Sequence, residues 1–165
     1  MKGETESTEI RPALVTDAAA ISGLSGQLGY PTSQRQAEQR LGAILGSKDQ
    51  AVLVALVDRQ VVGWLHICLC PVITSDPFAE ICGLVVSHSH RRCGLGRRLL
   101  AAAEMWATRS GVSTLRVRSR SDRDDARAFY ENLGFTIRKE QRVFDKSLLK
   151  DFFPPHRLRQ RSSPL

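Results

Sequence analysis

The stretch that most constrains the fold runs from Phe78 to Trp106 and reads FAEICGLVVSHSHRRCGLGRRLLAAAEMW. Residues 79–86 are apolar and end in β-branched residues, which predicts a buried strand. A polar turn follows, and from Gly94 onward apolar residues recur at helical spacing. Because the first turn of a helix has free amides and the positive end of the helix dipole, this geometry favours binding of a pyrophosphate.

The turn over residues 91–96 reads RRCGLG. It is not the nucleotide P-loop, because no Gly-Lys-Ser/Thr follows it, and it is not the dinucleotide fingerprint, because Leu99 stands where the third glycine should be. Glycines let the backbone approach an anion closely, and arginines add positive charge. The residues that we predict to hold a pyrophosphate are Arg91, Arg92, Cys93, Gly94, Leu95, Gly96, Arg97 and Arg98.

The rest of the chain alternates short apolar runs with helical patterns. Strands are predicted over residues 8–13, 51–57, 61–70, 79–86 and 113–119, with two more beginning at residue 135 and spanning 141–148. Helices are predicted after a cap at Thr16 or Asp17, after the capping box that begins at Ser33, from Gly94, and before Gly134. This order indicates a mixed sheet with helices on both faces, in which 79–86 and 113–119 are parallel because a helix crosses over between them. We expect one domain over 1–149 and a disordered basic tail over 150–165.

A second motif lies in the C-terminal half, where residues 126–135 read ARAFYENLGF. Taken in order with the turn RRCGLG, it resembles the two signatures of the GNAT N-acetyltransferase superfamily. The resemblance covers residues 10–148 and departs at Arg123, where many members carry Asn. It implies an α/β (α+β) fold with a mixed, mostly antiparallel sheet, a central splayed pair of parallel strands, and helices on both faces.

The resemblance also implies an activity and roles for particular residues. The activity is transfer of an acetyl group from acetyl-CoA to a primary amine of a small molecule or peptide, by direct attack in a ternary complex. The pantetheine arm of CoA is expected to pair with the strand edge at Leu84, Val85 and Val86. Glu80 is expected to act as general base and Tyr130 as the acid that protonates the leaving thiolate.

Alternatives remain open for both catalytic residues. Glu80 can instead form a salt bridge at the mouth of its strand, with His88, His90 or a water chain serving as base. Tyr130 can be a core residue on the apolar stripe of its helix. His66 lies in the middle of a strand and is interpreted as a core histidine.

The acceptor is not specified by any motif. Its pocket is expected from the loops at 27–30 and 71–77 and from the last predicted hairpin, with Asp76 and Glu80 receiving a cationic amine. A homodimer is expected, because resembling enzymes often pair through edge strands or the C-terminal hairpin.

Composition narrows the alternatives. The net charge is +7, of which the segment 150–165 contributes +3, and a basic balance can indicate nucleic acid. The strand at 113–119 carries arginines without the aromatic residues that stack on bases, so this reading is less favoured than a CoA-dependent enzyme or an inactive CoA-binding module. The cysteines lack zinc-ligand spacing, so no metal is expected. No apolar run approaches the ~20 residues of a membrane span, and residues 1–9 lack a signal-peptide pattern, so a cytoplasmic protein is expected.

Overall fold

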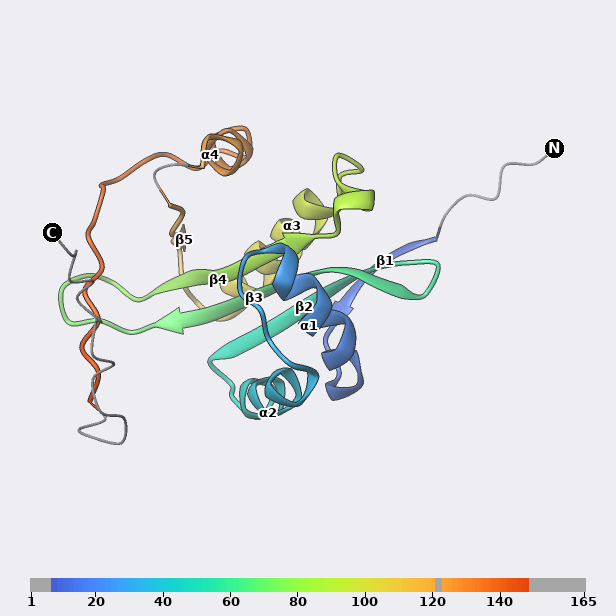
Figure 1. Ribbon diagram of the computed structural model, residues 1–165. Helices are drawn as coiled ribbons and strands as arrows, with labels where there is room; N and C mark the ends of the chain where they lie inside the picture. The colour runs from blue at the N-terminus through green and yellow to red at the C-terminus, as the bar shows by residue number, and fades with distance from the viewer. Residues whose placement is uncertain (1–6, 121–122, 149–165) are drawn as a thin grey trace, which may run out of the picture.

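The computed structural model describes residues 7–120 and 123–148 (Figure 1). Within these residues the chain forms one sheet of five strands in the order β1-β2-β3-β4-β5. The element order is β1 (Thr8–Pro12), the 3₁₀ turn η1 (Val15–Asp17), α1 (Ala18–Gln27), α2 (Gln34–Leu45), β2 (Gln50–Val57), β3 (Gln60–Cys70), β4 (Phe78–Val86), the 3₁₀ turn η2 (His88–His90), α3 (Leu95–Arg109), β5 (Leu115–Val117) and α4 (Asp124–Glu131).

The strands β1 to β4 are antiparallel neighbours, and β5 pairs with β4 in parallel. The parallel pair is separated in sequence by α3, which makes the crossover that parallel strands require. The predicted fold class, a mixed and mostly antiparallel sheet with helices, is therefore confirmed.

The two faces of the sheet bury separate apolar clusters. Alternate residues of β2 illustrate this, since Leu53 and Ala55 pack in the cluster with α3, whereas Val52 and Val54 pack in the cluster with α1 and α2. Such alternation follows from the two-residue period of a strand. Figure 1 shows α1 and α2 in front of the sheet and α3 behind it, so the prediction of helices on both faces is confirmed.

The side-chain cap predicted for the second helix is present, whereas the one predicted for the first, at Thr16 or Asp17, is wrong, since the residue before α1 makes no side-chain cap bond. Ser33 accepts a bond from the Gln36 amide, and the Gln36 side chain returns a bond to the Ser33 amide, so the predicted capping box is present. Asp17 stands at the start of α1, but its carboxylate binds the Leu14 amide at 2.8 Å and the Arg11 guanidinium at 2.8 and 3.0 Å. This buried carboxylate thus ties the start of α1 to β1.

The two strands predicted from residue 135 and over 141–148 are not formed. Residues 135–148 contain no strand, all side chains from 136 to 148 are exposed, and β5 is only three residues long. A strand needs a neighbour for its backbone bonds, and a three-residue edge offers a short one. The parallel pair therefore lies at the end of the described sheet, not at its centre. The predicted tail, 150–165, lies outside the described residues, and none of the described helices has the length and apolar character needed to cross a membrane.

Candidate functional site

The parallel strands β4 and β5 separate after three residues. β5 pairs with β4 only at Ala79, Glu80 and Ile81. Opposite β3, the register shifts because Cys82 is an extra residue on β4, immediately before Gly83. Such a bulge bends its strand. From residue 84 to 86, the backbone of β4 thus has β3 on one side and no strand partner among the described residues on the other.

The first turn of α3 begins beside this open edge. Gly94 precedes the helix with φ of 79°, a left-handed conformation that favours glycine. The first bond of the helix runs from the Arg98 amide to the Gly94 carbonyl, 3.1 Å away. The amides of residues 95–97 therefore precede the helical ladder and have no partner within it, as anion binding requires.

The four arginines of the turn point in different directions. The Arg98 guanidinium binds the hydroxyl and carbonyl of Thr8 at the start of β1, and its amide is already used by Gly94. The geometry therefore does not support the predicted role of Arg98 as an anion donor. Arg91 reaches back to the Val86 carbonyl at 3.4 Å, whereas Arg92 and Arg97 are exposed around the turn.

The two sequence signatures meet at Gly96. A Cβ at this position would lie 3.2 Å from the ring of Phe129 in α4, so the missing side chain of Gly96 makes room for that ring. Tyr130 follows Phe129 and makes edge-to-face contacts with Phe129 and Phe135 at 5.1 and 5.4 Å between ring centroids. Tyr130 therefore lies on the helix that packs against the start of α3.

The surroundings of Tyr130 favour the neutral form of its phenol. Burial raises the pKa of the phenol above its ordinary value, and the positive charge of Arg123 opposes this shift. Arg123 is the position at which the sequence departs from the superfamily signature, and it also lies 3.6 Å from Asp125 in an ion pair. A phenol that stays protonated at neutral pH is a suitable proton donor.

Glu80 lies in β4 with its side chain only 16% exposed. One carboxylate oxygen accepts a bond from Arg118 Nε at 2.9 Å, so the salt bridge considered as an alternative is present. The other oxygen, Oε2, is buried and has no hydrogen-bond partner among the described residues. An unsatisfied buried carboxylate oxygen requires an explanation, and a bound ligand or water provides one.

The histidines are placed less favourably for proton transfer. His66 binds the Gln50 side chain at 3.0 Å, and burial lowers its pKa, which fits the expected core histidine. His88 is exposed on the turn after β4, where its amide donates to Gln27 at the end of α1. His90 contacts Ser89 in the same turn.

The bulge brings the thiol of Cys82 beside those of Cys68 and Cys70, which the two-residue period of a strand places on one face. Cys68 Sγ lies 3.2 Å from Cys82 Sγ and 3.8 Å from Cys70 Sγ. Burial raises the pKa of Cys68 and of Cys70 to about 11, so both remain protonated near neutral pH. Neither thiol is therefore a nucleophile under ordinary conditions. No cluster of metal-ligating side chains occurs in the part of the chain that the structure describes.

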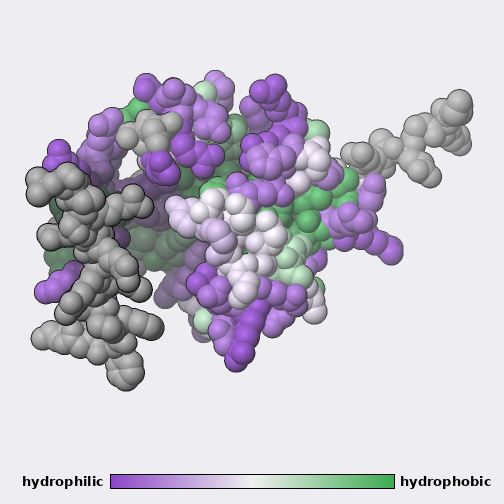
Figure 2. All heavy atoms as spheres, viewed as in Figure 1, coloured by the Kyte–Doolittle hydropathy of each residue, from purple (hydrophilic) through white to green (hydrophobic). Residues whose placement is uncertain are grey.

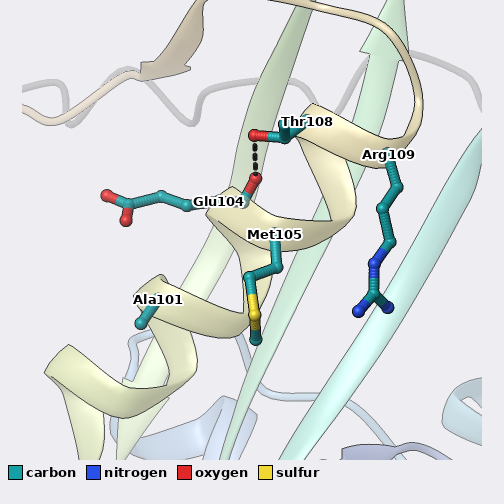
Figure 3. A pocket seen from close by; sticks show the side chains of 5 residues that line it. All are labelled: Ala101, Glu104, Met105, Thr108 and Arg109. Atoms are coloured by element: carbon teal, nitrogen blue, oxygen red, sulfur yellow. Dashed lines mark hydrogen bonds between the residues drawn. The ribbon is translucent and has the colours of Figure 1, made fainter.

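Two hollows in the surface of the described residues can be compared with the site. The larger, of about 420 Å³, lies over the outer side of α3, and all the side chains drawn around it in Figure 3 come from that one helix. None of them is a candidate catalytic or binding residue. The second, of about 310 Å³, lies where β4 and β5 begin, next to Glu80 and its partner Arg118. In Figure 2 the surface is recessed over this part of the sheet.

Comparison with known proteins gives a consistent result. A family model described as the acetyltransferase (GNAT) family matches residues 21–135. An uncharacterized N-acetyltransferase of Bacillus subtilis (strain 168) is 32% identical over 136 residues, which cover 76% of this chain and 88% of that protein. A streptothricin acetyltransferase of Escherichia coli is 29% identical over 54% of this chain and 49% of its own length. The structure of an aminoglycoside N-acetyltransferase in complex with CoA superposes with a TM-score of 0.78 and 21% identity, covering 90% of this chain and all of that one.

Proposed function

Because the chain belongs to the GNAT acetyltransferase family and is an acyltransferase, we propose that it transfers an acetyl group from acetyl-CoA to a primary amine of a small molecule. The proposed route is direct attack by the amine while both substrates are bound. One observation carries the proposal: the free first-turn amides of α3, behind the left-handed Gly94, lie beside the unpaired edge of β4.

The described residues fit both halves of the cofactor. The pyrophosphate would be held by the amides of residues 95–97, with Arg92 and Arg97 adding positive charge. The pantetheine arm is an amide chain, and the open backbone of residues 84–86 would pair with it as a strand would. When bound, acetyl-CoA supplies the activated acetyl group at its thioester.

The two candidate catalytic residues would handle the protons. Glu80 would accept a proton from the attacking amine through Oε2, the oxygen that Arg118 does not occupy. Tyr130 would donate its phenolic proton to the departing thiolate, a role that its raised pKa supports because the proton is retained at neutral pH. The raised pKa of the nearby thiols supports direct transfer over an acyl-enzyme.

The proposal is tested by changing charge at the start of α3 without changing shape. Gly96→Asp and Gly96→Asn crowd Phe129 equally, but only Asp places a negative charge among the free amides. At the exposed Arg97, Arg97→Gln and Arg97→Glu form a second matched series. Calorimetry should show that acetyl-CoA binding is weakest in the two acidic variants, at unchanged unfolding temperature within each pair.

Equal CoA affinity in the Asp and Asn variants, together with equal affinity in the Gln and Glu variants, would refute the assignment of the pyrophosphate site. Turnover is followed separately as release of free thiol from acetyl-CoA over a library of amines. Tight CoA binding without turnover of any amine would indicate that the protein binds CoA but does not catalyse acetyl transfer.

A further inference from the structure

The second hollow is lined by basic side chains. Its walls come from the loop before β4, from the start of β4, from β5 and the residue after it, and from the segment that follows α4. The lining residues are Val72, Thr74, Ser75, Phe78, Arg116, Arg118, Arg138 and Lys139. Four of these eight carry a positive charge and none carries a negative one. We refer to this hollow as the basic pocket.

Among the described residues, one of the four cations is paired with a carboxylate. Arg118 forms the ion pair with Glu80, whose second oxygen is the proposed base. Arg116, Arg138 and Lys139 have no carboxylate partner in the part of the chain that the structure describes. Like charges gathered in one hollow repel each other, and a bound anion relieves this repulsion.

Arg116 is held in a position suited to binding an anion. Its guanidinium carbon lies 3.6 Å from the centre of the Phe78 ring, and Phe78 is itself only 4% exposed. A guanidinium stacked on an aromatic ring keeps its N–H groups free at the edge, where their planar fork matches a carboxylate or phosphate. Most arginines of a solvated basic face are not fixed in this way, whereas Arg116 is half-buried and oriented.

The basic pocket adjoins the proposed reacting centre. Arg116 is the parallel-strand partner of Glu80, and Phe78 precedes Glu80 by two residues in β4, on the same face. Two residues of a strand span roughly 7 Å. An acceptor whose amine reaches Glu80 Oε2 would therefore place a group lying about that distance away inside the pocket.

We propose that the basic pocket binds an anionic group of the acceptor, so that the substrates are small amines that carry a carboxylate or phosphate. This inference rests on the proposed function and gives it a substrate class. It differs from the expectation of a cationic acceptor received by Asp76 and Glu80, because Asp76 does not line the pocket and every charged residue that does is basic. Aminoglycosides carry several positive charges and would be repelled there.

The test compares acceptors that differ only in charge. One arm pairs ω-amino acids of three to six carbons with their carboxamides, and the other pairs 2-aminoethyl phosphate with ethanolamine. Thiol release should show kcat/KM roughly 10- to 100-fold higher for the anionic member of at least one arm, as charge-assisted bonds predict. The arm with the larger ratio identifies carboxylate or phosphate as the preferred group.

The variants Arg138→Gln and Lys139→Gln change exposed side chains and should fold normally. Combined in one protein, they should raise the KM for the anionic acceptor about tenfold and leave the KM for the corresponding carboxamide unchanged. Arg116→Lys keeps the charge without the fork and should restore only part of the activity lost in Arg116→Gln. Arg35→Gln, at the exposed start of α2, removes the same charge at a distance and should leave the preference unchanged.

CoA affinity, measured by calorimetry in every variant, separates this inference from the proposed function. If the anionic acceptors and their uncharged counterparts are acetylated with equal kcat/KM, the pocket does not bind an anionic group. The proposed acetyltransferase activity would be unaffected by that result. If no amine is acetylated, binding of the same acceptor pairs to the enzyme–CoA complex decides the matter. Tighter binding of the anionic acceptor, lost in Arg138→Gln and Lys139→Gln, would support an anion site in the pocket. Equal binding of the two members of each pair would refute it.

Discussion

The role of Glu80 can be separated from its ion pair by two substitutions, one at each member of the pair. Glu80→Gln retains an oxygen that can accept the bond from Arg118 and removes the proposed base at Oε2. Arg118→Gln removes the other member of the pair and leaves the Glu80 carboxylate in place. A purely structural role predicts at least as large a loss in Arg118→Gln, because that variant leaves a largely buried carboxylate without its partner.

The magnitudes decide between the two roles. Arg118 is 60% exposed, so water weakens the ion pair, and Glu80→Gln should lower the unfolding temperature by no more than about 4 °C. Arg118→Gln should lower it further, because the largely buried carboxylate of Glu80 then lacks its partner. Loss of a general base typically costs ~10²–10⁴-fold in rate, which corresponds to about 2.7–5.4 kcal/mol in the barrier. We therefore expect kcat/KM to fall by at least ~100-fold in Glu80→Gln and by far less in Arg118→Gln for an uncharged acceptor.

The assay is thiol release measured from pH 5 to pH 10, with thermal unfolding of each variant as the control. The acidic limb of the kcat/KM profile should disappear in Glu80→Gln and persist in Arg118→Gln, because only the first variant loses the base. Equal losses of activity in the two variants would refute the base assignment and leave Glu80 as half of a salt bridge.

Three further predictions concern other parts of the molecule. Tyr130→Phe should lower kcat, while CoA affinity measured by calorimetry stays unchanged. Because burial raises the pKa of the Tyr130 phenol, the basic limb of the wild-type pH profile should lie above 10, the ordinary pKa of tyrosine. An unaltered kcat would show that Tyr130 takes no part in the chemistry. Asp17→Asn should cost ~1–3 kcal/mol of unfolding free energy at pH 7 in urea titrations, whereas Asp49→Asn on an exposed turn should cost little. Since the bond from Arg11 lowers the pKa of Asp17, its contribution is present above about pH 3.8 and is lost as the pH falls through the lowered value, so a constant difference down to pH 2 would contradict it. We also propose a homodimer that covers the exposed side chains of Ile137, Val143, Phe144 and Leu148, and a monomeric mass by light scattering at micromolar concentration would exclude it.

Much of the fold could be predicted because local sequence patterns and the packing of the sheet and helices agree over residues 7–117. The alternation in β2 and the stripe of α3 each specify one buried face, and the capping box at Ser33 marks the start of its helix. The segment after α4 shows the limit of such patterns. Its β-branched and aromatic residues favour a strand, but a strand also needs a neighbour to accept its backbone bonds, and local sequence does not report one.

The features of the site that the backbone forms could be predicted from the sequence. The directions of the arginine side chains could be predicted less well. Glycine at 94 and the helix start that follows are backbone features, and both were found from the sequence. Arg97 and Arg98 are adjacent on a helix and so project about 100° apart, which explains why Arg98 contacts β1 instead of the turn. The alternation of β5 predicted a basic face, but the approach of Arg138 and Lys139 to it depends on the path of the chain after α4.

Gly96 links the two halves of the proposed machinery. The first signature places a glycine there, and the Phe129 ring of the second signature fills the space that a side chain would take, 3.2 Å from where a Cβ would lie. That contact fixes α4 against α3, and Tyr130 is the next residue along α4. The cofactor turn and the proposed acid are thus positioned by one packing contact, so a displacement of either helix would disturb both. Two motifs separated by some thirty residues in the sequence therefore act as one structural unit.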